Sequence, residues 1–250
     1  MKVCVRGYKP LVIPDAAVAT EKGAFNATTP YVAKLTTRLT KRGYLANKLP
    51  AKLLCLEALK RRMLELGGYS SFAEPLAGVG LSTRIFDMGG KLYLNDFDAG
   101  CRKVLAANFK GKIGGEDVLS MKIPKTDVVF LDFNDFTFKR YIKGPYGVVL
   151  SRAFASAKNF VILNDCSVFY FRYGKKSYAT YSKYVGSKVT CPEDYFVALG
   201  AHISRRYPGW GLSYVAYFRD TAFLLFARDR AEAIVEYISS PEPIVTVEGI

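Results

Sequence analysis

The segment Phe72-Ala-Glu-Pro-Leu-Ala-Gly-Val-Gly-Leu-Ser82 and the later segment Lys91-Leu-Tyr-Leu-Asn-Asp-Phe-Asp98 decide the fold of this chain. The first has the composition of a buried strand that ends in an acidic residue and turns through Gly78 and Gly80 into a helix. Such a turn lets the backbone pass close to a nucleotide-like ligand. The second is an apolar run that ends at Asp96, where a carboxylate can accept both hydroxyls of a ribose. Glycines after a strand often serve only the turn, so the second acidic strand end strengthens the prediction of a ligand site.

Apolar periodicity continues this pattern as alternating strands and helices. The run Thr126-Asp-Val-Val-Phe-Leu-Asp132 is typical of a strand buried on both faces of a parallel sheet, and it places Asp132 at a carboxyl strand end. Two β-rich runs at 210–218 and 222–227 predict an antiparallel hairpin. The α/β class follows, with strands expected at 71–74, 91–96, near 113, 126–132 and 159–164, and helices at 82–87, 99–109, 148–157 and 230–238.

The N-terminal part differs from this pattern. A basic amphipathic helix is expected at 31–42 and a second helix at 50–66, preceded by an irregular arm with one short strand at 3–5. The basic end of the second helix, at 60–62, is either solvated or in contact with phosphates. The expected organisation is a basic, mostly helical extension at 1–68, a main domain at 69–240 and a tail at 241–250.

The charge of the chain indicates a polyanionic partner. The formal net charge is +14, and residues 1–70 hold 13 Lys and Arg against 4 Asp and Glu, which places +9 of the excess there. Such an excess attracts a polyanion through its long-range field and through counterion release. We therefore expect a nucleic-acid partner, RNA or DNA. A generally basic protein without such a partner is the alternative.

Other features exclude several classes of protein. The sequence has no run of about 18 uncharged apolar residues and no N-terminal signal pattern, so neither a membrane partner nor secretion is expected. Its five cysteines are scattered without Cys-x-x-Cys spacing, which favours a reducing, cytoplasmic or nuclear location. Neither the cysteines nor the single His202 predicts a metal site.

Glu74-x-x-x-Gly78-x-Gly80, followed by Asp96-x-Asp98 before a helix, resembles the S-adenosylmethionine site of class I methyltransferases. The Glu-Pro-Leu-Ala-Gly-Val-Gly form is most similar to the nucleic-acid-modifying branches, which include adenine-N6 DNA methyltransferases and several tRNA and rRNA enzymes. The resemblance covers residues 69–228 and implies a Rossmann-like, seven-stranded, mostly parallel sheet with a C-terminal antiparallel hairpin. The cofactor contacts that it implies are Glu74, Gly78 and Gly80 around the methionine portion, Asp96 at the ribose, and Phe97 and Asp117 at the adenine. For Asp117, a loop or capping aspartate is an equal alternative.

The resemblance also implies a catalytic loop. In these branches an Asp/Asn-Pro-Pro-Tyr/Phe loop after the fourth strand polarises the amino group of a flipped base and stacks on its ring. Asp132-Phe-Asn-Asp-Phe136 lies at that position. Asp132, Asn134 and Asp135 would polarise the substrate, and Phe136 would stack on it. Both prolines of the family loop are absent, so a loop that only closes a strand is the alternative.

The segment 169–184 interleaves five tyrosines with four basic residues beyond the fifth strand. Cations for phosphates beside rings for bases are the composition of a single-strand or flipped-base platform. The candidate substrate contacts are Tyr173, Lys175, Lys176 and Tyr178. Alternatively, the tyrosines pack against the body of the protein and the lysines are solvated.

The leading hypothesis is an S-adenosylmethionine-dependent methyltransferase that acts on a nucleic-acid base. The principal alternative is a catalytically inactive protein of the same fold that binds nucleic acid or serves a protein partner as an assembly or activator subunit; the missing prolines favour it. A methyltransferase for proteins or small molecules is a third hypothesis, which leaves the basic extension and the tyrosine–lysine segment without a role.

Overall fold

The structure of the chain is a computed structural model, and it describes residues 1–18, 32, 35, 39, 49–133, 146–165, 175–218, 221–230, 232–238 and 245–248. The strands are β1 (Lys2–Val5), β2 (Leu11–Val12), β3 (Ser71–Glu74), β4 (Lys91–Asn95), β5 (Lys112–Gly114), β6 (Thr126–Leu131), β7 (Ala157–Asp165), β8 (Trp210–Phe218), β9 (Thr221–Arg228), β10 (Ile234–Tyr237) and β11 (Val245–Glu248). The helices are α1 (Asp15–Val18), α3 (Leu49–Glu65), α4 (Leu81–Phe86), α5 (Ala99–Asn108), α7 (Tyr146–Ser156), α9 (Lys175–Val185) and α10 (Pro192–Arg206).

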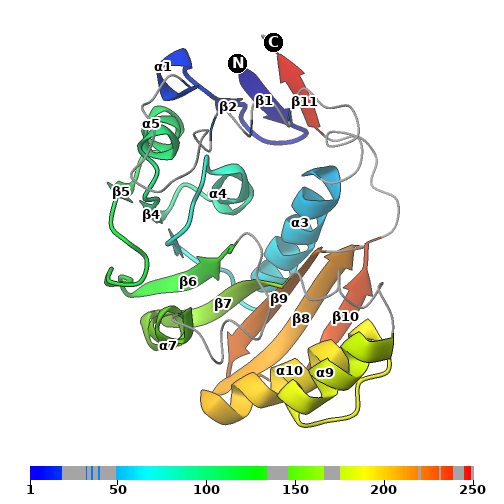
Figure 1. Cartoon of the computed structure of the whole chain (residues 1–250). Coiled ribbons are helices and arrows are strands. Elements are labelled where there is room, and N and C mark those ends of the chain that lie inside the picture. Colours follow the sequence, from blue (N-terminus) through cyan, green and yellow to red (C-terminus); the bar gives the residue numbers. More distant parts are fainter. Residues whose placement is uncertain are drawn as a thin grey trace.

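The centre of the molecule is a mostly parallel sheet (Figure 1). Within the described part of the chain it has eight strands in the order β10-β8-β9-β7-β6-β3-β4-β5. The strands β7, β6, β3, β4 and β5 are parallel, and β9 runs antiparallel to β7 and β8. This confirms the expected α/β sheet and its C-terminal hairpin; β10 adds an outer strand parallel to β8.

Helices cover both faces of this sheet (Figure 1). Side chains alternate along each strand, so Phe130 of β6 faces the core beneath α3, α4 and α5, whereas Val129 and Leu131 face the core beneath α7, α9 and α10. Every residue of β6 is buried, as expected for a strand covered on both faces. The carboxyl ends of β3, β4 and β6 therefore meet at one edge, where the candidate site lies.

Two parts of the secondary structure differ from the sequence-based prediction. The helix expected at 230–238 is wrong, because Ile234-Val-Glu-Tyr237 forms β10 beside β8. The strand is fixed by tertiary pairing: Ile238 N donates to Tyr217 O at 2.8 Å. The sequence-based prediction also missed α9 and α10, although the buried residues Phe196, Leu199 and Ile203 of α10 recur at helical spacing.

A small second sheet joins the two ends of the described chain. Its order is β11-β1-β2, and β1 pairs antiparallel with β11 from Lys2 opposite Glu248 to Val5 opposite Val245. Figure 1 shows the N and C ends side by side above α3 and α4. The segment expected as a tail thus contributes a strand. In the helix expected at 31–42, the described residues Val32, Leu35 and Leu39 are helical and buried.

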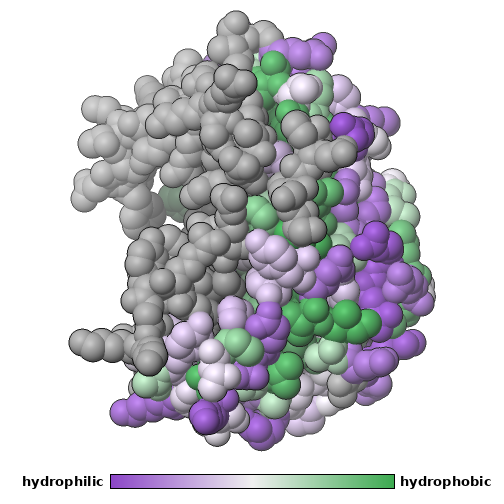
Figure 2. Space-filling model, turned by 90° about the vertical axis from the view of Figure 1, so that its right-hand side faces the viewer, coloured by the Kyte–Doolittle hydropathy of each residue, from purple (hydrophilic) through white to green (hydrophobic). Residues whose placement is uncertain are grey.

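The outer edge of the main sheet keeps some apolar surface. Ile234 and Tyr237 of β10 are 41% and 50% exposed. Figure 2 shows that side of the molecule, where hydrophobic patches lie among hydrophilic ones. Scattered exposed apolar residues of this kind are ordinary on a protein surface.

Candidate functional site

The glycine turn after β3 connects two neighbouring strand ends. Gly78 and Gly80 have φ angles of 55° and 82°, in the left-handed region that favours glycine. The Gly78 N–H donates to Asp96 Oδ2 at 2.8 Å, and the Ala77 N–H donates to Asn95 O at 2.9 Å. The turn and the end of β4 therefore form one unit, as the two-strand interpretation of the sequence requires.

Gly80 also has a packing role. A Cβ atom at this position would lie 2.4 Å from Phe109 Cε2 and 2.9 Å from Leu105 Cδ2. Both residues belong to the core beneath α4 and α5. Close approach of α4 to α5 therefore gives a reason for glycine at residue 80 that involves no ligand.

Asp96 directly follows β4, and each of its carboxylate oxygens accepts one backbone N–H, with the Cys101 thiol also in contact with the carboxylate. Oδ2 accepts from Gly78 N, and Oδ1 accepts from Asp98 N at 2.9 Å. Burial raises the pKa of Asp96, while these two hydrogen bonds oppose the shift. A carboxylate has about four lone-pair positions, so Asp96 has acceptor capacity beyond its two backbone donors. Phe97, the next residue, is 50% exposed.

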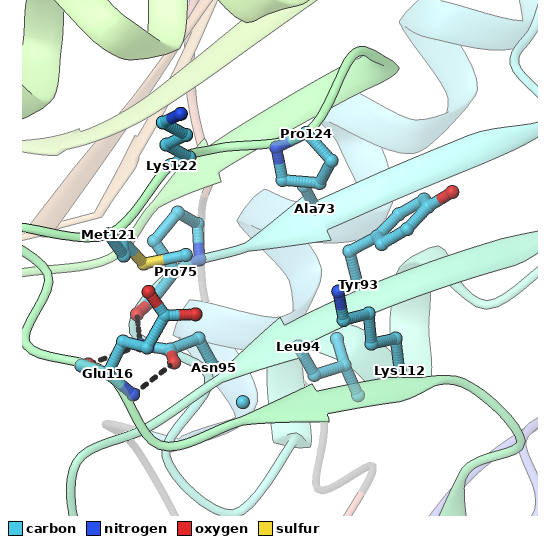
Figure 3. A pocket seen from close by; sticks show the side chains of 11 residues that line it. Ala73, Pro75, Tyr93, Leu94, Asn95, Lys112, Glu116, Met121, Lys122 and Pro124 are labelled. Carbon is cyan, nitrogen blue, oxygen red and sulfur yellow. Dashed lines mark hydrogen bonds between the residues drawn. The ribbon is translucent and has the colours of Figure 1, made fainter.

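A pocket with about 80 Å³ of free volume lies against β3, β4 and β5 (Figure 3). Tyr93 and Lys112 are paired neighbours on β4 and β5, and both line it. At the other end, Asn95 Nδ2 donates to Pro75 O at 3.0 Å and Asn95 Oδ1 accepts from Glu116 N at 2.9 Å. Asn95 thus fixes the connection after β5 next to Asp96.

Asp117 lies in that connection and is exposed. Its Oδ1 accepts from Leu119 N at 2.9 Å, and its backbone carbonyl accepts from Met121 N at 2.9 Å. This geometry is that of a turn-capping aspartate, the alternative left open by the sequence. Its Oδ2 has no partner among the residues that the structure describes.

Glu74 ends β3 and is almost fully buried, with 1% of its surface exposed. Thr83 Oγ1 donates to Glu74 Oε2 at 2.5 Å. Burial raises the pKa of Glu74 well above its ordinary value of 4.5, and the Asp132 and Asp96 carboxylates raise it further, whereas Thr83 and Lys52 lower it. The Glu74 carboxyl therefore keeps its proton to a higher pH in the folded protein than in the unfolded chain.

Asp132 directly follows β6 and lies in a polar cluster. Lys52 Nζ of α3 donates to Asp132 Oδ2 at 2.5 Å, and Asn164 Nδ2 of β7 donates to Asp132 Oδ1 at 2.6 Å. Ser82 Oγ of α4 approaches Oδ2 at 3.4 Å. Three elements thus converge on one carboxylate, whose side chain is 8% exposed.

Comparisons with known proteins test the fold. No family model matches the sequence, and no curated protein is significantly similar to it. Among solved structures, the plantazolicin methyltransferase BpumL, in complex with a monoazolic desmethylPZN analog and SAH, matches with a TM-score of 0.53 and 10% identity, over 79% of this chain and 90% of that one. The chain has the methyltransferase fold. Magnesium protoporphyrin IX methyltransferase (ChlM) from Synechocystis PCC 6803 with bound SAH also matches, with a TM-score of 0.44 and 14% identity, over 71% of this chain and 83% of that one.

In this methyltransferase fold, the structure brings Glu74, Gly78, Asp96 and Asp132 to one edge of the sheet. Asn134, Asp135, Phe136 and Tyr173 lie outside the described residues. Lys175 and Lys176 begin α9. Tyr178, also on α9, is partly buried and packs against the core beneath α7, α9 and α10, which agrees with the packing alternative for this residue.

Sequence reasoning missed Lys52, Thr83, Asn95 and Asn164. Lys52 lies in a helix whose apolar stripe was recognised, but periodicity does not reveal which charged side chain turns inward. Asn95 and Asn164 end strands, so their position beside the acidic strand ends was the available signal. Among the described residues, no cluster of His, Cys, Asp or Glu could hold a metal ion. Within the same ranges, every helix is too short or too polar to cross a membrane.

Proposed function

We propose that this chain is an S-adenosylmethionine-dependent methyltransferase that acts on a nucleic-acid base. The observation that carries the proposal is the hydrogen bond from Gly78 N to Asp96 Oδ2, which joins the glycine turn to the acidic end of β4 within a methyltransferase fold. The cofactor itself supplies a methyl group on a sulfonium that is already activated. The protein then has to bind it, orient the nucleophile and manage one proton.

The described residues fit this cofactor at its nucleoside end. Asp96 has acceptor capacity beyond its two backbone donors that would serve the ribose hydroxyls, and Phe97 offers an exposed ring. Gly78 would leave space for the methionine portion, above the buried Glu74. Asp117 would contribute through its free Oδ2 if it meets the adenine amino group.

Asp132 would polarise the substrate amine, assisted by Asn134 and Asp135, and Phe136 would stack on the base. The net charge of +14 supports a nucleic-acid substrate, RNA or DNA. Tyr173, Lys175, Lys176 and Tyr178 would contact it. We also propose a cytoplasmic or nuclear location, because the described Cys4, Cys55, Cys101 and Cys191 are free thiols.

The test begins with calorimetric titration of S-adenosylmethionine into the wild type, Asp96→Ala and, as a charge control, Glu65→Ala on the exposed part of α3. We expect binding to the wild type and to Glu65→Ala, and at least a tenfold loss of affinity in Asp96→Ala, because the ribose hydroxyls lose their acceptor. Thermal unfolding of each variant checks that it folds.

A radiolabelled methyl-transfer screen over RNA and DNA follows, with Asp132→Ala as the inactive variant. Transfer to nucleic acid that is lost in Asp132→Ala would support the full proposal. Cofactor binding with tight, salt-sensitive nucleic-acid binding but no transfer would favour the inactive assembly or activator subunit. If the wild type bound no cofactor, the enzyme proposal would fail for the isolated chain.

A further inference from the structure

Lys52, which lies in the N-terminal part of the chain, places a positive charge at the carboxyl end of β6. It lies in the first turns of α3, which packs on β8 and β9, and its side chain is 27% exposed. Its Nζ lies 2.5 Å from Asp132 Oδ2 and 5.9 Å from the centre of the Phe223 ring. An ammonium group held between a carboxylate and an aromatic face has little freedom to move.

The donors around Asp132 occupy most of its hydrogen-bonding capacity. An ionised carboxylate has about four lone-pair positions, two on each oxygen. Lys52 and Ser82 approach Oδ2, whereas Asn164 alone donates to Oδ1. Among the described residues, one acceptor position therefore remains, and it is on Oδ1. A single N–H donor would fill it.

Glu74 lies near Asp132, so the site holds two carboxyl groups, and the positive charge of Lys52 offsets the repulsion between them. Asp132 and Lys52 both act on the pKa of Glu74, which shows that the three groups share one electrostatic environment. Two carboxylates in one poorly solvated site disfavour double ionisation. Lys52 pairs with Asp132 directly, while Glu74 bonds to the neutral Thr83 hydroxyl. The ammonium group of Lys52 is therefore held by Asp132, whereas Glu74, whose pKa is raised by burial, contacts a hydroxyl.

We propose that Lys52 is a positioning residue that holds the Asp132 carboxylate through Oδ2 and leaves Oδ1 to accept one N–H of the substrate. This inference rests on the proposed function and deepens it, because it assigns a nucleophile that carries an N–H, such as an exocyclic amino group. It also gives the N-terminal extension a direct role at the site. A nucleophile that is itself an anion would meet a carboxylate and is disfavoured.

The decisive variants are Lys52→Met, Lys52→Arg and, as a matched control on the same helix, Lys60→Met, which lies over Tyr8 away from Asp132. With saturating nucleic-acid substrate, we expect kcat of Lys52→Met to fall about 100-fold, as expected for a misplaced reacting group. The KM for substrate and the affinity for S-adenosylmethionine should stay within about threefold of wild type. Lys52→Arg should recover much of the lost rate, because it restores the cation.

If the ion pair between Lys52 and Asp132 only stabilised the fold, a different result is expected. Lys52→Met would then lower the free energy of unfolding and leave the kcat of the folded molecules unchanged. Undiminished kcat in Lys52→Met would overturn the positioning role, and so would an equal loss in Lys60→Met. Loss of rate with no rescue by Lys52→Arg would also count against it, provided that Lys52→Arg folds as judged by thermal unfolding.

A second measurement separates this inference from the proposed function. If the wild type transfers no methyl group, the proposed function fails, and urea unfolding of Lys52→Met, Asp132→Asn and the double variant then decides the inference. We expect the combined effect to differ from the product of the single effects by about fivefold or more in the unfolding equilibrium constant. If the effects of the two single variants on the unfolding equilibrium constant simply multiplied in the double variant, Lys52 would not hold Asp132.

Discussion

Glu74 is an acidic side chain buried beside two other carboxylates, and this makes the stability of the fold depend on pH. Burial first, and then Asp132 and Asp96, raise its pKa in the folded protein. Above pH 4.5 the folded state therefore binds a proton that the unfolded state releases, so the free energy of unfolding decreases as pH rises toward the folded pKa.

Glu74→Gln removes this titration and keeps an oxygen that can accept from Thr83. We expect the melting temperature of the variant, relative to wild type, to increase steadily from pH 5 to pH 8. Glu65→Gln serves as the control, since the Glu65 side chain is 53% exposed and should show no such trend. A flat difference between Glu74→Gln and wild type over this range would contradict a raised pKa.

A comparison of Gly80 with Gly89 separates the free-energy cost of overpacking at the site from the cost of backbone strain. Their φ angles are 82° and 78°, but a Cβ at Gly80 would collide with Phe109, whereas nothing lies within 4 Å of one at Gly89. We expect Gly89→Ala to cost about 1 kcal/mol for its backbone alone. Gly80→Ala should cost about 1–3 kcal/mol more, through overpacking.

Urea unfolding of both alanine variants measures this difference. Cofactor titration of Gly80→Ala then shows whether the same clash disturbs the turn at Gly78. Equal stabilities for the two variants would mean that α4 shifts without cost and that the packing explanation for Gly80 is incorrect.

At the residue scale, the sequence located the acidic strand ends but not their partners. Asp96 and Asp132 follow apolar runs, and that pattern alone places them at the carboxyl edge. Their hydrogen bonds to Gly78, Lys52 and Asn164 depend on how distant elements pack. Local spacing carries no information on such contacts.

At the scale of elements, the side chain of Asn108, at the end of α5, makes the hydrogen bonds that a neighbouring strand would make with β2. Its Oδ1 accepts from Val12 N at 2.7 Å, and its Nδ2 donates to Val12 O at 2.6 Å. The side chain thus satisfies the outer edge of the small sheet, where a bare strand would expose unpaired backbone groups.

We expect Asn108→Ala to speed hydrogen exchange of the Val12 amide about tenfold and to lower the free energy of unfolding by about 1 kcal/mol. Asn108→Asp retains the acceptor for Val12 N and should preserve part of the protection. Exchange of the Val5 amide, within β1, is the internal reference. Unchanged protection at Val12 in Asn108→Ala would show that this contact does not secure β2.

Elements of the sheet were predicted well because their signals are local. The strands β3, β4, β6, β8 and β9 are short apolar runs between turn residues, and each was found within one or two residues. β10 was misassigned because its four residues become a strand only when β8 offers an unpaired edge. Its alternation over so short a length cannot be distinguished from a helical turn.

At the scale of the whole molecule, the proposed binding of nucleic acid should depend on the basic charge of the chain. The basic group at the end of α3 is divided by its contacts: Lys60 lies 5.2 Å from the Tyr8 ring centre, and Arg62 pairs with Glu65 at 3.2 Å. Arg61 is exposed, so it is the residue of this group that is best placed to meet a phosphate.

We expect the affinity for a single-stranded oligonucleotide to fall steeply with salt, and Arg61→Gln to reduce the slope of log K against log salt by about 0.7. Arg230→Gln, an exposed arginine near the C-terminal end of β9, is the control. Fluorescence anisotropy at several salt concentrations measures both slopes. Equal slopes for Arg61→Gln and Arg230→Gln would indicate that the end of α3 is solvated and contacts no phosphate. A nearly flat slope in the wild type would count against a nucleic-acid partner.

The pairing of β1 with β11 has a consequence for the order in which the two sheets form during synthesis. β1 and β11 lie far apart in the sequence, yet Lys2 lies opposite Glu248. The core of the main sheet can assemble as the chain emerges, since its parallel units follow one another in sequence. The small sheet is complete only after β11 has been made. β1 can therefore pair early with β2, but it pairs with β11 only after the strands of the main sheet have been made.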